Sequence, residues 1–371
     1  MRFLLSFVIA LLLVGAASGQ CAARDPDQIR VALAKGVESV KLDGIGVLLV
    51  DERGEPLRLK MPVQIRRVGD TLRVDGRKVR LLIASGPACV RINGRGYRGS
   101  VEIEPFERGM LVVNELPLEE YLAGLINGEI SSQWPMEIVK AQAVIARTYA
   151  LYQKNLRGAA PYHLEATVLD QVYDGCDRVD SRAIQGVEET AGEVLTYEGK
   201  IIQAFYHSIC GGTTEAVENV WGASLPYLTG VTCDACLTAP NFQWEQSFPV
   251  RKLEQELRGV FPQVSGLKGV RAGSRSRSGR LTELIAVTPR GERSIPAVAF
   301  RKTLGYTVVR STNFEVRTVG GTVFLSGIGY GHGVGLCQWG ARQRAAEGAD
   351  YRDILAHYYP GTTLTTLQHG R

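Results

Sequence analysis

The chain shows two kinds of hydrophobic pattern, and each kind predicts a different element. From about residue 41 to residue 115, short apolar or alternating runs are broken by Arg-Gly, Gly-Asp and Asp-Gly turns. Runs of this kind are typical of β-hairpins, so this segment is expected to be β-rich. Just before it, residues 26–40 predict a short amphipathic helix.

A helical period begins near residue 116. Residues 116–128 predict one helix, with Pro117 at a plausible first helical position, and a second helix is expected to run from Pro135 to about residue 153. The second helix carries more apolar residues than a single stripe needs, so it is expected to be buried. Residues 165–245 then return to strands and loops.

The last third of the chain mixes both patterns. Short helices are expected at residues 250–258 and 297–304, a hairpin between them, and a glycine-rich loop leading into two final helices. The predicted fold class is α+β, β-rich with a few buried helices. The predicted divisions are a signal peptide at 1–19, a β-rich region at 20–94 and a main domain at 95–367, within which 250–325 forms a sub-domain or insertion.

The N-terminus has the pattern of an export signal. Arg2 precedes an apolar run over residues 3–15, and Ala17-Ser18-Gly19 offers small residues for cleavage. Cys21 raises the alternative of a lipoprotein, but Gln20 is bulky where lipidation needs a small residue. No other stretch is long and apolar enough to span a membrane, so the chain is expected to be exported, periplasmic or associated with the cell wall.

The net charge of the chain indicates which class of binding partner to expect. It is +5 for the whole chain, or +4 once Arg2 is removed, and acidic and basic residues are well mixed. This balance gives no indication of nucleic-acid binding, and an anionic polymer outside the cytoplasm is the more natural partner. A loop with Arg271, Arg275, Arg277 and Arg280 either touches such a polymer or forms a solvated hairpin tip.

Glu129 is the first candidate for chemistry. It stands at the end of the first helix among Leu125, Ile126, Ile130 and Trp134. The plain interpretation is a solvated charge at a helix end. The alternative is a desolvated carboxyl with a raised pKa, as a general acid near neutral pH requires.

Two cations on the following helix are candidate substrate-binding residues. Lys140 and Arg147 are seven residues apart and therefore share one helix face. An arginine within such an apolar helix is costly unless it is paired. Arg147 is therefore expected to have an anionic partner, either from the protein or from a ligand.

The stretch "IGYGHGVGLCQWGA" is the second candidate. His332 lies between glycines that allow close backbone approach, while Gln338 and Trp339 offer an amide and a flat apolar face, the two surfaces that sugars use. The plain alternative is a tight turn with a capping histidine. The context is not that of a dinucleotide-binding loop.

The third candidate is a metal site. The mature chain has seven cysteines, and "HSIC" with "CDAC" gives two two-residue spacings. These spacings predict a closed, structural zinc site, whereas export favours disulfides. The other cysteines, at 21, 89, 176 and 337, show no motif. The predicted ligands are His207, Cys210, Cys233 and Cys236.

Ordered segments from "VNELPLEEYLAGLINGEISSQWPMEIVKAQAVIARTYAL" to "GYGHGVGLCQWGARQRAAEGADYRDILAHYYPGT" resemble the stage II sporulation protein D and amidase-enhancer (LytB) family over about residues 95–367. The resemblance implies a peptidoglycan lytic transglycosylase acting on glycan strands stripped of stem peptides, beside a cell-wall amidase. It places the catalytic glutamate on Glu129 and the basic cleft residues on Lys140 and Arg147. This chain departs from the family in its His/Cys set and in Cys337, where Ser or Thr is usual.

A lone carboxylate suits this chemistry. Ordinary glycosidases need two, whereas a lytic transglycosylase uses the C6 hydroxyl of N-acetylmuramic acid as the nucleophile, so that one glutamate serves as acid and then as base. No cofactor is then required for catalysis, and a zinc ion would be structural. The alternatives are a non-catalytic wall-binding enhancer of an N-acetylmuramoyl-L-alanine amidase and, third, a zinc hydrolase.

Overall fold

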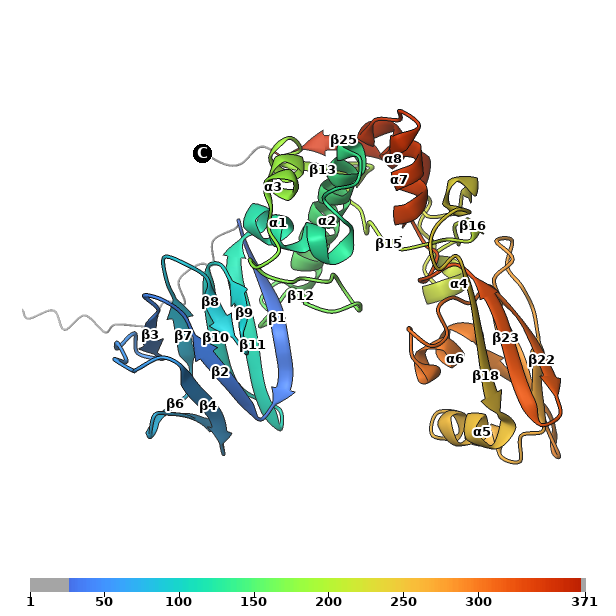
Figure 1. Ribbon diagram of the computed structural model, residues 1–371, viewed down its shortest axis with the longest axis horizontal. Coiled ribbons are helices and arrows are strands. Elements are labelled where there is room, and N and C mark those ends of the chain that lie inside the picture. Colours follow the sequence, from blue (N-terminus) through green and yellow to red (C-terminus); the bar gives the residue numbers. More distant parts are fainter. Residues whose placement is uncertain (1–26, 368–371) are drawn as a thin grey trace, which may run out of the picture.

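The computed structural model describes residues 27–367, so the predicted signal peptide and Cys21 lie outside the described residues. Figure 1 shows three parts in a row: N-terminal strands at one end, helices in the middle, and a mixed α/β part at the other end. The predicted class, α+β and β-rich, is confirmed. Within residues 27–367, no helix is long and apolar enough to cross a membrane.

The N-terminal part is built from two sheets of short strands. The first sheet has the order β12-β1-β11-β10-β7-β3 and the second the order β6-β5-β4-β2-β8-β9. The first contains β1 (Gln28–Val37), β3 (Leu48–Asp51), β7 (Leu82–Ser85), β10 (Ser100–Phe106), β11 (Gly109–Pro117) and β12 (Leu164–Glu165). The second contains β2 (Ser39–Asp43), β4 (Val63–Val68), β5 (Thr71–Val74), β6 (Arg77–Val79), β8 (Val90–Ile92) and β9 (Arg95–Tyr97).

The predicted helix at residues 26–40 is wrong, because this segment forms β1 and the start of β2. Ile29 and Val31 alternate into the core. Arg30 between them is paired with Glu115 on the neighbouring β11 and with Glu102 on β10, the strand beyond it. β1 lies antiparallel to β11 and parallel to β12. Pairing with strands distant in sequence has overridden the helical propensity of its Ala and Leu residues.

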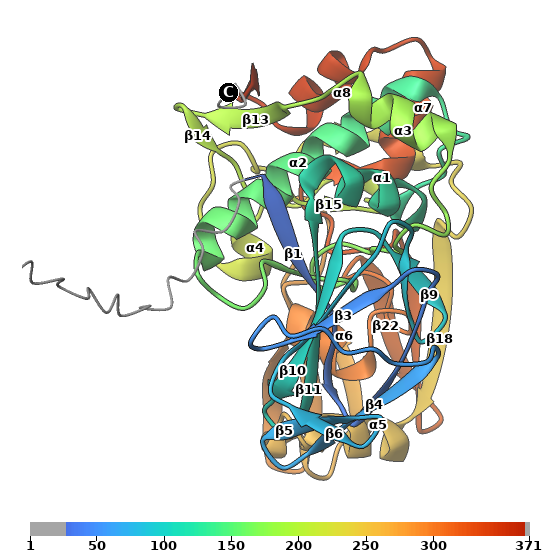
Figure 2. The ribbon, with the colours of Figure 1, turned by 90° about the vertical axis from the view of Figure 1, so that its left-hand side faces the viewer.

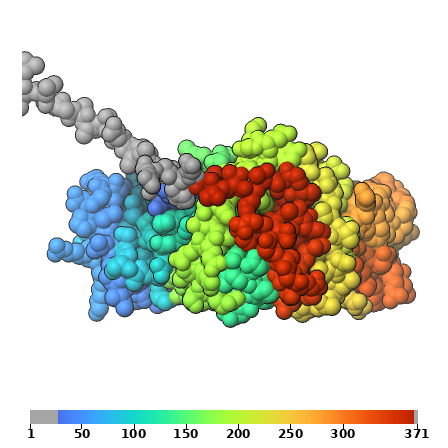
Figure 3. All heavy atoms as spheres, turned by 90° about the horizontal axis from the view of Figure 1, so that it is seen from above, coloured from blue at the N-terminus to red at the C-terminus, as the bar shows by residue number. Residues whose placement is uncertain are grey.

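The helical middle is formed around α2 (Met136–Arg157). It packs against α1 (Leu118–Glu129), α3 (Ser181–Glu188), α7 (Gln338–Ala346) and α8 (Tyr351–Tyr358). Its buried residues include Ile138, Val139, Ala143 and Val144, which point to different sides of the helix, so the prediction of a well-buried helix is confirmed. Figure 2 shows these helices together above the strands, and Figure 3 shows the C-terminal residues covering part of this middle region.

Short strands close the middle region. The strands expected within residues 165–245 include β13 (Glu193–Tyr197) and β14 (Lys200–Ile201), which pair around Glu198-Gly199. β25 (Thr363–Thr366) pairs with β13 from the far end of the chain. The remaining elements are β15 (Tyr206–His207), β16 (Gly212–Thr213), α4 (Glu218–Trp221), β17 (Thr232–Cys233) and β24 (Leu336–Cys337).

The far part has a core of its own. Its buried residues run from Trp244 to Leu325 and do not join the main cluster, and they come mostly from the segment 250–325, predicted as a sub-domain. The predicted helices are α5 (Val250–Arg258) and α6 (Ala297–Leu304). The strands are β18 (Gln243–Pro249), β19 (Gly269–Ala272), β20 (Glu283–Thr288), β21 (Gly291–Pro296), β22 (Phe314–Val319) and β23 (Thr322–Ile328).

Candidate functional site

Glu129 is the last residue of α1, and three groups from distant segments hold its carboxylate. The backbone N–H of Val172 donates to Oε1 at 2.6 Å. The Gln338 amide donates to Oε2 at 3.5 Å, and the Tyr206 hydroxyl donates a further hydrogen bond. The side chain of Glu129 remains partly exposed. The site therefore combines a dense polar cradle with access for a substrate.

Small residues on α1 bring Val172 within reach. Gly124 and Gly128 are four residues apart and share one helix face. A Cβ at Gly128 would meet the Val172 carbonyl oxygen at 2.7 Å, and one at Gly124 would meet the Gly175 oxygen at the same distance. Because neither glycine has a side chain, the loop that carries Val172 lies directly against the helix.

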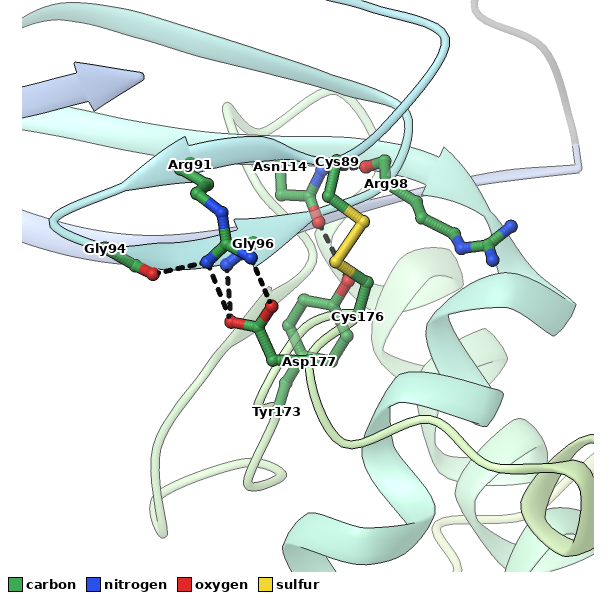
Figure 4. Close-up of a disulfide and its surroundings, with 9 residues drawn as sticks. All are labelled: Cys89, Arg91, Gly94, Gly96, Arg98, Asn114, Tyr173, Cys176 and Asp177. Atoms are coloured by element: carbon green, nitrogen blue, oxygen red, sulfur yellow. Dashed lines mark hydrogen bonds and ion pairs between the residues drawn. A yellow bond between two sulfur atoms is a disulfide. The ribbon is translucent and has the colours of Figure 1, made fainter. Parts of the chain in front are cut away.

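A disulfide fastens the other side of this loop. Cys176 is bonded to Cys89 in the N-terminal part. Beside the disulfide, Asp177 accepts hydrogen bonds from the Gly96 N–H and from the Arg91 guanidinium. Figure 4 shows how these bonds join the loop to the strands. The loop segment that holds Glu129 is thus anchored to a different part of the protein.

The other two donors are placed by a short parallel pairing. Tyr206 lies opposite Leu336, where β15 pairs with β24. β24 ends at Cys337, and α7 begins with the next residue, Gln338. Gly335 makes this approach possible, since its φ is +72° and a Cβ there would lie 1.9 Å from the Phe205 carbonyl oxygen. The glycines around His332 therefore allow the close approach that the sequence predicted.

The environment of Glu129 raises its pKa from the ordinary 4.5 to about 7. The main cause is desolvation by burial, which disfavours the charged form. The hydrogen bonds from Val172, Tyr206 and Gln338 act in the opposite direction but do not cancel it. Near neutral pH the carboxyl is therefore divided between its protonated and ionised forms, and it can both give and take a proton.

An aromatic surface is formed by Trp134, five residues after Glu129, and Trp339, the neighbour of Gln338. The rings of Trp134 and Trp339 meet edge to face with centroids 4.9 Å apart. The Arg342 guanidinium lies over both, 5.5 and 5.0 Å from the ring centroids. Trp339 is adjacent to Gln338, so the apolar face and the amide predicted from "LCQWGA" lie at the same end of α7.

A second carboxylate near Glu129 is already engaged. The negative charge of Asp174 also raises the pKa of Glu129, but by less than desolvation does. Its two oxygens are paired with Arg95 at 3.1 Å and with Arg178 at 2.9 Å. Paired in this way, Asp174 is poorly suited to act as a nucleophile or base.

Lys140 and Arg147 do not join Glu129; both are paired with other carboxylates. Arg147 is 1% exposed and forms two bonds with Glu119, of 2.7 and 2.6 Å. Lys140 is bound by Glu137 and Glu189 at 3.0 and 2.7 Å. The expected anionic partner of Arg147 thus comes from the protein. The assignment of both cations to a substrate cleft stays a prediction.

His332 also has a structural environment. Its Nε2 donates to the Tyr206 carbonyl at 3.0 Å, and its Nδ1 accepts from the Val334 N–H at 3.0 Å. Burial holds the pKa of His332 well below its usual range. Both nitrogens are thus engaged by backbone groups, and the neutral ring supports the loop beside β15. Its role as a cleft residue stays a prediction.

The predicted metal set is changed in one member. Cys210, Cys233 and Cys236 lie together as expected, but the fourth neighbour is Cys337, with all four sulfur atoms within 4.8 Å of one another. His207 is turned away: its Nδ1 donates to the Val334 carbonyl at 3.1 Å. The loop arginine Arg280, expected at a solvated tip or against a polymer, is 1% exposed.

Sequence reasoning missed two of the three donors to Glu129. Val172 acts through its backbone, which no side-chain motif reveals; the only signal was the Gly124 and Gly128 spacing on α1. Tyr206 directly precedes "HSIC", and no motif in the sequence marks it as a partner of Glu129. Only Gln338 was named as a candidate and is found in contact with the acid.

Fold and site together define a mixed α+β protein with a desolvated carboxyl group at the end of α1. A family model described as stage II sporulation protein matches residues 107–197, and one described as a domain of unknown function (DUF8618) matches residues 216–335. The chain is 30% identical over 286 residues to stage II sporulation protein D of Bacillus subtilis, covering 71% of this chain and 79% of that protein. It belongs to the stage II sporulation protein D family.

Other relatives extend the comparison. An uncharacterized protein of Brachyspira hyodysenteriae is 36% identical over 275 residues, which cover 74% of this chain and 73% of that protein. The amidase enhancer of Bacillus subtilis is 30% identical over 295 residues, covering 66% of this chain but 40% of the enhancer. The family resemblance seen in the sequence is thereby confirmed.

Proposed function

We propose that this protein is an exported peptidoglycan lytic transglycosylase in which Glu129 is both the general acid and the general base. The observation that carries the proposal is the carboxyl group of Glu129, with a pKa of about 7 and partial exposure. A group that is half protonated near neutral pH suits a reaction in which it first donates a proton and then accepts one.

The reaction follows from this single group. Protonated Glu129 gives its proton to the glycosidic oxygen between N-acetylmuramic acid and N-acetylglucosamine, and the bond from that oxygen to the anomeric carbon breaks. The C6 hydroxyl of the same N-acetylmuramic acid attacks the anomeric carbon, and ionised Glu129 takes the hydroxyl proton. The products are a 1,6-anhydro end and a free N-acetylglucosamine end, and Glu129 returns to its protonated form.

The pairing of Asp174 with two arginines supports this chemistry over ordinary hydrolysis. Retaining and inverting glycosidases need a nucleophile or a base in addition to the acid. Asp174, the carboxylate whose charge reaches Glu129, is held by two arginines. An intramolecular hydroxyl needs no second carboxylate, and the proposed reaction requires no cofactor.

The surroundings of the acid suit a glycan. Sugars present hydroxyl edges to amides and apolar ring faces to aromatic side chains. Gln338 supplies an amide at the acid, and Trp134 with Trp339 supplies flat apolar surface next to it. Arg342, which lies over both rings, adds a positive charge that favours the lactyl carboxylate of N-acetylmuramic acid in strands stripped of stem peptides.

The relatives support a role in the cell wall. The names stage II sporulation protein D and amidase enhancer belong to chains that share most of the length of this one. An amidase that removes stem peptides would generate the denuded strands proposed here as substrate, so a cell-wall amidase is the partner we propose. These names support the proposed location outside the cytoplasm, at the wall.

Product analysis tests the proposal. Denuded glycan strands are incubated with the wild-type protein and with the Glu129→Gln variant, and products are identified by mass spectrometry. The wild type is expected to give 1,6-anhydro ends and the variant to lose at least about 100-fold in rate. Glu120→Gln, at an exposed position of the same helix, is the matched control. Anhydro products formed by Glu129→Gln at the wild-type rate would refute the assignment.

A second function, favoured by the amidase enhancer among the relatives, is non-catalytic stimulation of an amidase. It predicts binding to denuded strands without any new product, and stimulation of N-acetylmuramoyl-L-alanine amidase that is equal for wild type and Glu129→Gln. A protein that both stimulates the amidase and releases anhydro products in a Glu129-dependent manner would combine the two functions.

A further inference from the structure

Four buried cysteines meet where three segments of the chain converge. Cys210 follows β15, Cys233 and Cys236 flank a short turn after β17, and Cys337 ends β24. Their sulfur atoms all lie within 4.8 Å of one another, and those of Cys210 and Cys236 are 3.4 Å apart. Four sulfurs around a zinc ion at about 2.3 Å would be about 3.8 Å apart, close to this spacing.

The surroundings of the sulfurs are those of bound thiolates. The N–H groups of Cys210 and Gly340 donate to the sulfur of Cys337 at 3.3 and 3.4 Å. The Tyr358 hydroxyl lies 3.1 Å from the sulfur of Cys233. A thiol is a weak acceptor, so several donors directed at sulfur are more useful when the sulfur carries the negative charge of a metal ligand.

Gly340 provides the space that the sulfur cluster occupies beside α7. A Cβ at Gly340 would meet the sulfur of Cys233 at 2.4 Å and the hydroxyl of Tyr358 at the same distance. The first turn of α7 therefore packs directly on the cluster, with the Cys337 sulfur as the side-chain acceptor at its N-terminus. Any other residue at 340 would displace part of the sulfur arrangement.

A buried arginine supplies an independent indication of charge. Arg280 is 1% exposed, and within the described residues its Nε and Nη1 have no hydrogen-bond partner. Its Nη2 donates to the carbonyl of Cys210, at the edge of the cluster. Glu215, also buried, is occupied by hydroxyl, amide and N–H donors. An unpaired buried guanidinium is costly, and a zinc ion with four thiolates carries a net charge of −2 that would compensate it.

We infer that Cys210, Cys233, Cys236 and Cys337 bind one zinc ion in a closed tetrahedral site. On binding, the four thiols release four protons and form four Zn–S bonds, with no change in oxidation state. Since the protein fills all four positions, the ion is structural and not hydrolytic. Two disulfides would join the same sulfurs in pairs and carry no charge, which would leave the charge of Glu215, already bound by four donors, to balance Arg280. The inference does not depend on the proposed transglycosylase activity.

Metal and thiol content of the wild-type protein decide between zinc and disulfides. The full-length mature protein is purified without chelator, zinc is measured by plasma mass spectrometry, and thiols are titrated after denaturation with a chelator. We expect one zinc and five thiols per chain, from the four ligands and Cys21, with Cys89 and Cys176 oxidised. Absence of zinc together with fewer than two titratable thiols would overturn the inference, as would stoichiometric iron in place of zinc.

Paired variants decide the ligand set. Cys337→Ser is expected to bind zinc at least 10-fold more weakly, while His207→Ala is expected to retain the ion. Replacement of zinc by cobalt(II) is expected to give tetrahedral, sulfur-rich absorption in wild type and in His207→Ala. Zinc that is retained by Cys337→Ser and lost by His207→Ala would show that the ligands are those predicted from the sequence. If Cys337→Ser does not fold, the cobalt spectrum of the wild type still distinguishes four sulfur ligands from three.

Discussion

Substitution of Glu129 by glutamine is expected to change the pH dependence of stability as well as activity. Glutamine has nearly the same shape as glutamic acid and can accept the Val172 N–H through its side-chain oxygen. It carries no charge at any pH. The comparison between wild type and variant therefore isolates the free energy of ionising a carboxyl group in this desolvated position.

The magnitude follows from the raised pKa. Glu129 has a pKa of about 7 in the folded protein and about 4.5 when unfolded. Below pH 4.5 both states are protonated, and this group does not change stability with pH. Between pH 4.5 and 7 the unfolded chain loses the proton first, so the free energy of unfolding falls as pH rises. The full loss is about 3 kcal/mol, reduced to about 2 kcal/mol by the partial exposure of the side chain.

Urea unfolding at pH 4 and at pH 8.5 measures this effect. Relative to wild type, Glu129→Gln is expected to gain about 2 kcal/mol of stability between the two pH values, with most of the change from pH 4.5 to pH 7. Glu120→Gln serves again as the control, because its exposed carboxyl group is expected to show no such gain. Parallel pH curves for wild type and Glu129→Gln would mean that the acid is not desolvated, and the argument for its catalytic role would fail.

Three further changes test the neighbourhood of the site. Tyr206→Phe removes a donor that favours ionised Glu129; the alkaline limb of the rate–pH profile is expected to move to higher pH and the rate to fall about 10-fold. A rate–pH profile identical to that of the wild type would exclude a hydrogen bond from Tyr206 to Glu129. Arg147→Met is expected to lose about 3 kcal/mol in urea unfolding while the rate per folded molecule stays the same; a selective loss of rate would instead support its assignment to the cleft. Replacing Cys89 and Cys176 by serine is expected to lower stability by about 2–4 kcal/mol and expose the adjoining loop to limited proteolysis; an equally resistant loop would show that the disulfide does not anchor it.

Local pattern predicted the helices around the site well. The boundaries of α1 and α2 differ from the prediction by a few residues, and the cost of burying a guanidinium correctly required a partner for Arg147. The position of Glu129 at the end of α1 follows from the apolar run before it. What the pattern did not reveal is whether the partner of Arg147 is a ligand or, as found, Glu119.

Local sequence pattern could not predict the features that depend on pairing between segments distant in the chain. β1 was predicted as a helix because its partner β11 begins more than 70 residues later in the chain. Cys337 showed no motif because its place beside Cys210 is fixed by the β15 and β24 pairing, across 127 residues. In both cases the decisive neighbour is set by the tertiary fold, and no local window of sequence contains it.

The cradle of Glu129 has a consequence for when the acid becomes competent. Its donors come from a loop tied by a disulfide, from β15 and from the start of α7. While any of these segments is still out of place, solvent reaches the carboxyl group and its pKa stays near the ordinary 4.5, which leaves almost no protonated acid at neutral pH. In the proposed reaction, an incompletely folded chain would therefore be inactive toward glycan strands. Completion of the fold would itself activate the acid.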